Sequence, residues 1–153
     1  MKAFSFKLKT LLHLRDIEKQ NALSSYGRSV RERENIEKTL LNKRNYLENL
    51  KEQVAKRRTF NFTGYGEEVF QRSVKSTLDQ ILQIHGELEN AKKIENAKRN
   101  LFLTAESRFK SLENLKEKKR MEHQSAELQK EESELEDIVG SRFVYNLKLS
   151  HSP

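Results

Sequence analysis

The chain has 153 residues, of which 35% are hydrophobic and 35% are charged, and its net charge is +7. So small a share of apolar residues excludes a thick globular core and favours an extended helical assembly. The absence of cysteine excludes disulfides and thiolate metal sites, and the single proline, at position 153, leaves the preceding chain free to form long helices. The four histidines are scattered (His13, His85, His123 and His151), so we expect neither a metal site nor a cofactor.

The N-terminal stretch MKAFSFKLKTLLHLRDIEK has no targeting or membrane-spanning pattern. Its longest apolar run is Leu11 and Leu12, with lysines and arginines close by. A secretory signal needs about 7–15 uninterrupted apolar residues, and a spanning helix needs about 20. We therefore expect a cytoplasmic protein without direct membrane insertion, which associates with a membrane only through a partner.

The first half of the chain has apolar residues at heptad spacing, which predicts a helix over residues 5–57. These residues occupy two positions of a seven-residue frame, the seam of a coiled coil. Arg33 and Lys43 fall in the same frame, so we expect a loosely matched pair of helices. The predicted seam residues are Leu8, Leu12, Ala22, Tyr26, Ile36, Leu40, Leu47, Leu50 and Val54.

A reversal is predicted over residues 58–66, where Gly64 and Gly66 supply backbone freedom. Glu67 and Glu68 then favour the start of a second helix, because negative charge in a first turn complements the helix dipole. The aromatic residues of this region either cover the end of the seam or form a knob that docks on a partner. They are Phe60, Phe62, Tyr65 and Phe70.

A second apolar stripe predicts a helix over residues 67–138, followed after Gly140 by a flexible tail, residues 139–153. The fold class is therefore all-α: one domain, residues 1–153, with two long helices in an antiparallel coiled-coil hairpin. At 1.5 Å per residue the helices span roughly 80 Å and 105 Å, so the second must overhang the first. The stripe comprises Val74, Leu78, Ile81, Ile84, Leu88, Ala91, Ile94, Leu101, Phe102, Ala105, Phe109, Leu112 and Leu115, and continues thinly through Met121, Leu128 and Leu135 to Ile138.

Composition and layout favour binding over catalysis. The sequence has no phosphate-binding loop, dinucleotide fingerprint or nucleophile elbow. Carboxylates on a two-helix hairpin also lack a desolvated pocket that could shift their pKa values, so we expect no enzyme. The 30 basic residues are interleaved with 23 acidic ones, so we expect no nucleic-acid binding, although the net charge keeps it as an alternative. A generic coiled-coil scaffold or adaptor is the other alternative.

Two segments have a recognisable pattern: the opening FSFKLKTLLHLRDIEKQNAL, and the later EKKRMEHQSAELQKEESELEDIV, which runs into a Glu-x-x-Glu-Leu-x-Asp motif. Both resemble segments of the FliJ family of flagellar type III export components. The resemblance implies a stalk whose paired termini enter a hexameric export ATPase, and we expect the hairpin to be monomeric when alone. It further implies contacts with a transmembrane export gate protein and with export chaperones, at the inner membrane.

The resemblance also implies two contact surfaces. The ATPase ring would contact Phe4, Phe6, Lys7, Leu8, Lys9, Leu11, Leu12, Arg15, Lys118, Lys119, Arg120, Leu128, Leu135 and Ile138, with the first apolar residues of the chain facing the last three. The export gate would contact Leu40, Leu47, Val74, Leu78, Ile81 and His85. Lys43, Leu47 and Val74 depart from the aromatic-rich pattern of the family. Several gate residues also fit the seam, so a purely structural role is the alternative for them.

Overall fold

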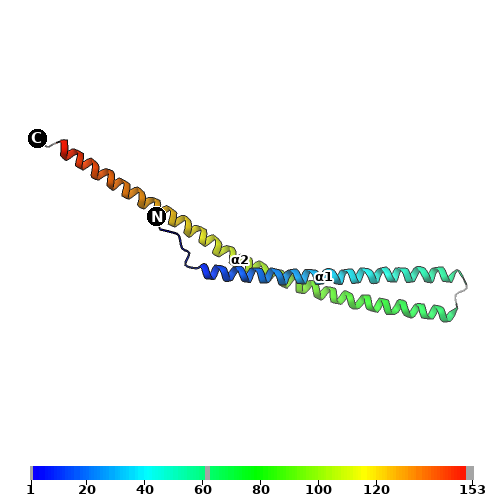
Figure 1. Ribbon diagram of the computed structural model, residues 1–153. Helices are drawn as coiled ribbons and strands as arrows, with labels where there is room; N and C mark the ends of the chain where they lie inside the picture. The colour runs from blue at the N-terminus through cyan, green and yellow to red at the C-terminus, as the bar shows by residue number, and fades with distance from the viewer. Residues whose placement is uncertain (1, 61–62, 151–153) are drawn as a thin grey trace. The chain divides into compact units, whose positions relative to one another are not determined.

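The computed structural model describes residues 2–60 and 63–150, and within these residues it contains two helices and no strand. Helix α1 (Lys9–Arg58) has 50 residues and helix α2 (Gly64–Ser150) has 87 (Figure 1). At 1.5 Å per residue they are about 75 Å and 130 Å long. The predicted all-α pair of packed helices, with the second longer than the first, is confirmed.

Helix α1 begins later than the sequence predicts, at Lys9 instead of residue 5. Residues 2–6 have no regular secondary structure, and the Phe6 carbonyl accepts a hydrogen bond from the Lys9 amide (3.2 Å). The first turn of α1 has no acidic residue. Lys56, Arg57 and Arg58 in its last turn complement the negative end of the helix dipole.

Helix α2 begins at Gly64, so Gly64 and Gly66 lie in its first turn. The prediction that both glycines belong to the reversal is therefore wrong. Thr63 is the reason, because its hydroxyl Oγ1 accepts a hydrogen bond from the Gly66 amide (3.1 Å) and caps the helix. Gly64 does not adopt a left-handed backbone conformation. The start of α2 is thus determined by a threonine cap and not by glycine flexibility.

The far end of α2 also differs from the prediction, because the helix passes through Gly140 and reaches Ser150. The predicted helix end at residue 138 and flexible tail are therefore wrong over residues 139–150. One glycine inside a helix costs only about 1 kcal/mol relative to alanine, and no proline interrupts this segment. The remainder of the predicted tail lies outside the described residues.

Contacts divide the chain into two compact units, one formed by residues 18–105 and the other by residues 1–17 and 106–153. Within residues 18–105, α1 and α2 run antiparallel (Figure 1). The rings of Tyr26 and Phe102 stack with centroids 6.4 Å apart. Arg33 lies one heptad after Tyr26 on α1, Glu95 lies one heptad before Phe102 on α2, and these two side chains form an ion pair. One more heptad brings Leu40 opposite Leu88, and both are only 5% exposed.

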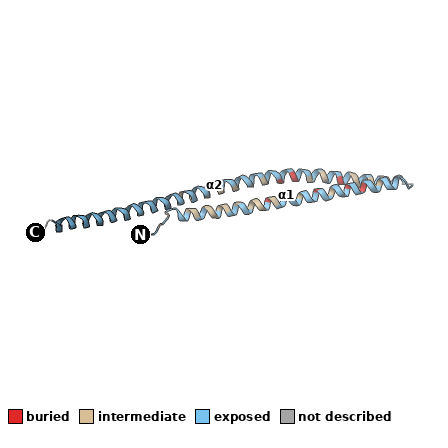
Figure 2. Ribbon diagram, turned by 90° about the horizontal axis from the view of Figure 1, so that it is seen from above, coloured by how far each residue is buried: buried red, intermediate tan, exposed pale blue. Residues whose placement is uncertain are grey.

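The core is thin, as Figure 2 shows by the few buried positions along the helices. The seam positions at which burial confirms the prediction are Leu40, Leu47, Leu50, Leu88 and Ala91. Two buried residues are polar, Ser29 and Thr77. The sequence predicts that Leu78 is buried in the seam, but its neighbour Thr77 is buried instead. The Thr77 hydroxyl donates a hydrogen bond to the Ser73 carbonyl (2.8 Å), so the buried polar group is satisfied. Other predicted seam residues are exposed, among them Leu78, Ile94 and Leu101.

Candidate partner-binding surfaces

The end of the hairpin carries an open groove of about 410 Å³ between α1 and α2, which we call the hairpin groove. Val54 and Val74 lie on opposite sides of it, two heptads beyond Leu40 and Leu88 in the same register. Basic side chains from both helices accompany these apolar residues. The groove is lined by Lys51, Val54, Ala55, Arg58, Gln71, Val74, Lys75 and Leu78.

The predicted gate-binding residues fall into two groups. Leu40 and Leu47 are 5% and 7% exposed, so their side chains belong to the seam and offer little surface to a partner. Val74 and Ile81 are half-buried, whereas Leu78 and His85 are exposed. The structure thus brings Val74 and Leu78 together in the hairpin groove. The groove residues of α1 are absent from the predicted set, although Val54 is in the predicted seam.

Two of the aromatic residues near the reversal point away from the seam into solvent. Phe60 is 84% exposed and Tyr65 is 79% exposed. Phe70 is half-buried, and the Arg57 guanidinium lies over its ring at 5.0 Å. Phe62 lies outside the described residues. An ion pair between Arg58 and Glu67 (2.7 Å) joins the two helices here.

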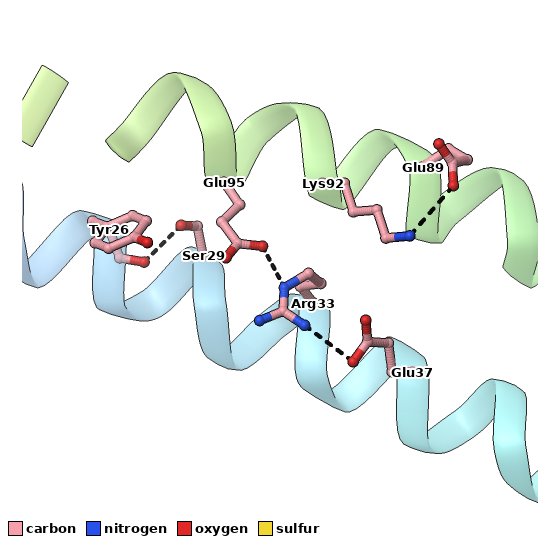
Figure 3. Close-up of polar contacts among 7 residues, drawn as sticks. All are labelled: Tyr26, Ser29, Arg33, Glu37, Glu89, Lys92 and Glu95. Carbon is pink, nitrogen blue, oxygen red and sulfur yellow. Dashed lines mark hydrogen bonds and ion pairs between the residues drawn. The ribbon is translucent and has the colours of Figure 1, made fainter. Parts of the chain in front are cut away.

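A polar cluster lies inside the seam (Figure 3). The Nε of Arg33 donates a hydrogen bond to Glu95 on α2, and the Nη1 of Arg33 is 3.0 Å from a carboxylate oxygen of Glu37. The hydrogen bond to Glu95, followed by that to Glu37, raises the pKa of Arg33. The side chains of Arg33 and Glu95 are only 23% and 19% exposed. A guanidinium held between two carboxylates stays charged, so the cluster adds a charged contact between the two helices.

The N-terminal segment, residues 2–8, packs against α2 within its own unit. The ring of Phe4 lies 5.7 Å from that of His123, whose Nε2 is 2.9 Å from the Lys2 carbonyl. A cavity of about 630 Å³ lies beside these contacts, and we call it the N-terminal cavity. It is lined by Lys2, Ala3, Phe4, Ser5, Phe6, Lys7, Leu8, Leu115, Lys119 and His123.

The N-terminal cavity unites five of the predicted ring-binding residues, but it pairs them differently from the expectation. Phe4, Phe6, Lys7 and Leu8 meet Lys119 there, together with Leu115 and His123. They do not line it with Leu128, Leu135 and Ile138, which the resemblance placed opposite them. Leu115 could have been found from the apolar stripe, whereas no sequence pattern indicates His123.

The other predicted ring-binding residues occupy three places in the same unit. Lys9, Leu11, Leu12 and Arg15 lie in the first two turns of α1, where all but Lys9 are half-buried. Lys118 and Arg120, on either side of Lys119, are exposed on α2. Arg120 hydrogen-bonds Glu117 (2.6 Å), and this bond is the main cause that lowers the pKa of Glu117.

Every residue of α2 from 128 to 150 is exposed. This segment includes Leu128, Leu135 and Ile138, which are 50%, 61% and 52% exposed. Further large apolar side chains follow them, and we call the whole set the C-terminal apolar stripe. Its members are Leu128, Leu135, Ile138, Val139, Phe143, Val144, Tyr145, Leu147 and Leu149.

Residues 2–60 and 63–150 contain no group of three or more His, Asp or Glu side chains placed to hold a metal ion. Neither described helix has a stretch that is both long enough and apolar enough to cross a bilayer.

Comparison with known protein families gives a match over most of the chain. The model of a family described as flagellar FliJ protein matches residues 4–148, which include most of both helices. No curated protein and no solved structure matches the chain. Because the family match extends over nearly all of the sequence, this chain belongs to the FliJ family.

Proposed function

We propose that this protein is a non-enzymatic stalk of the flagellar type III export apparatus. It inserts into the hexameric export ATPase, promotes assembly and activity of the ring, and connects the ring to the export gate and to export chaperones. Membership of the FliJ family supports the broader role in flagellar export. On this proposal the protein is cytoplasmic and is held at the inner membrane by the apparatus.

The observation that carries the proposal is the exposed end of α2. Residues 128–150 rise about 34 Å at 1.5 Å per residue and carry the nine side chains of the C-terminal apolar stripe. Exposed apolar surface of this extent marks an interaction site in a water-soluble protein. A helix exposed on all faces suits a partner that surrounds it, which is what the lumen of a ring provides.

We propose that the gate contact lies at the hairpin groove. Val74 and Leu78 are both predicted gate residues and both line it. The cations beside them, Lys51, Arg58 and Lys75, favour a gate surface that is acidic around an apolar centre.

The test is ATP hydrolysis by the hexameric export ATPase with and without the full chain, combined with electron microscopy of the ring. The wild-type protein should raise the rate and fill the central pore. A Leu135→Asp, Ile138→Asp double variant should lose both effects, because two charges replace apolar contacts in the lumen. A matched control is Leu82→Asp together with Leu101→Asp, at exposed positions of α2 outside the C-terminal apolar stripe. An unchanged rate and an empty pore with the wild-type protein would exclude the stalk.

The C-terminal apolar stripe also supports a second candidate, a coiled-coil scaffold in which two copies pair through it. Sedimentation distinguishes the two. The stalk predicts a monomer of 18.1 kDa that joins a hexamer singly, whereas a scaffold predicts twice that mass.

A further inference from the structure

The N-terminal cavity combines apolar walls with a basic rim. Its volume of about 630 Å³ lies within the range of protein ligand sites, roughly 300–1,000 Å³. Phe4, Phe6, Leu8 and Leu115 supply the walls. Of the described lining residues three are lysines (Lys2, Lys7 and Lys119), and none carries a carboxylate. The cavity therefore matches an apolar group that carries negative charge beside it.

Specific contacts hold the segment that closes this cavity. His123 contacts both the Phe4 ring and the Lys2 carbonyl, and the Phe6 carbonyl is bonded to the start of α1. Lys119 pairs with Glu122 at 3.4 Å, but both side chains are about half exposed (55% and 52%). Such an exposed pair is weak, so a carboxylate of a partner can replace Glu122.

We propose that the N-terminal cavity binds an acidic segment of a partner protein, which inserts a large apolar side chain and places flanking carboxylates on the lysines. A nucleobase is a poorer occupant, because its edges also need hydrogen-bond acceptors, and among the described lining residues only the side chains of Ser5 and His123 can accept. Five of the lining residues belong to the end assigned to the ATPase. The proposal thus deepens the proposed function and rests on it only for the identity of the partner.

The test measures binding of a fluorescent synthetic peptide to the full chain by anisotropy. The peptide is an amphipathic helix with Phe and Leu on one face and Glu on the others, and it is compared with the same peptide carrying Lys in place of Glu. The acidic peptide should bind and the basic one should not. Leu115→Glu and Lys119→Glu should each weaken binding by about tenfold or more, because each places a negative charge beside the carboxylates.

Two control variants carry the same charge changes elsewhere on α2. Leu82→Glu matches Leu115→Glu, and Lys93→Glu matches Lys119→Glu; both positions are exposed. Each should weaken binding less than about twofold at an ionic strength of about 0.15 M, where screening acts over about 8 Å. Equal losses in the control and cavity variants would show that only net charge attracts the peptide, and would overturn the proposal.

Two further measurements separate related explanations. Leu115→Glu also weakens packing of the N-terminal segment, so Ala3→Trp serves as a variant that fills the cavity with an apolar group, and it too should weaken binding. An oligothymidine that binds with the same dependence on Leu115 and Lys119 would overturn the peptide assignment. The peptide-binding assay does not use the ATPase, so a peptide that fails to bind would leave the stalk proposal intact. In the same way, a protein that does not stimulate the ATPase could still bind the peptide in the cavity.

Discussion

Replacement of Leu88 by alanine tests the heptad register of the helix pair. Leu88 and Leu40 are each 5% exposed, and the contacts of Tyr26 with Phe102 and of Arg33 with Glu95 place them opposite each other. The substitution removes three carbon atoms, worth about 0.8 kcal/mol each, or about 2.4 kcal/mol in total. The cavity that is left adds to this loss, but a thin seam can partly collapse around it. We therefore expect the free energy of unfolding to fall by about 2–3 kcal/mol.

The assay is urea unfolding of the full chain, followed by far-ultraviolet circular dichroism and by tyrosine fluorescence. Three of the four tyrosines, Tyr26, Tyr46 and Tyr65, lie in the same unit as Leu88, so the fluorescence reports on that unit. Leu82→Ala is the control, because Leu82 is 73% exposed, and it should change the free energy of unfolding by less than about 0.5 kcal/mol.

A double-mutant cycle then tests the pairing itself. If Leu40 and Leu88 are in contact, the effects of Leu40→Ala and Leu88→Ala should depart from additivity by about 0.5 kcal/mol or more. If Leu88→Ala lowers the free energy of unfolding by less than about 0.5 kcal/mol, the placement of Leu88 in the core is refuted. Strictly additive losses would refute the register.

Three other predictions concern polar contacts. Glu95→Gln should lower the urea midpoint of unfolding, because Arg33 loses a charged acceptor within the seam, and Arg33→Met combined with Glu95→Leu should restore the midpoint. A midpoint unchanged by Glu95→Gln would contradict a stabilising role for the ion pair. Thr63→Ala should reduce the free energy of unfolding by about 1 kcal/mol through loss of the α2 cap, and an unchanged value would show that the cap contributes nothing. The hydrogen bond from Arg120 lowers the pKa of Glu117, so the stability from this pair is present at neutral pH and is lost as the pH falls through that lowered pKa. In a carbon NMR titration Arg120→Gln should raise the pKa of Glu117, and no rise would rule out the hydrogen bond as the cause.

The candidate site could be only partly predicted from the sequence. The exposed apolar residues Leu128, Leu135 and Ile138 were found because they continue the period of the helix and carry the family pattern. The contact of Phe4 with His123 could not be found in this way, because it joins residues far apart in the chain and lies outside any helical period. Phe4 precedes the first helix, so its position depends on the surface that α2 presents to it.

The existence of two long helices followed from local properties of the chain. Proline is absent before position 153, apolar residues recur at heptad spacing, and charged residues occupy the remaining positions; these features act within a few turns of one helix. Tertiary structure decided which side chains enter the seam. Thr77 is buried and Leu78 is exposed, although Leu78 belongs to the predicted stripe and Thr77 does not. The heptad repeat of 3.5 differs from the helical period of 3.6, and only the position of the opposite helix selects between neighbouring faces.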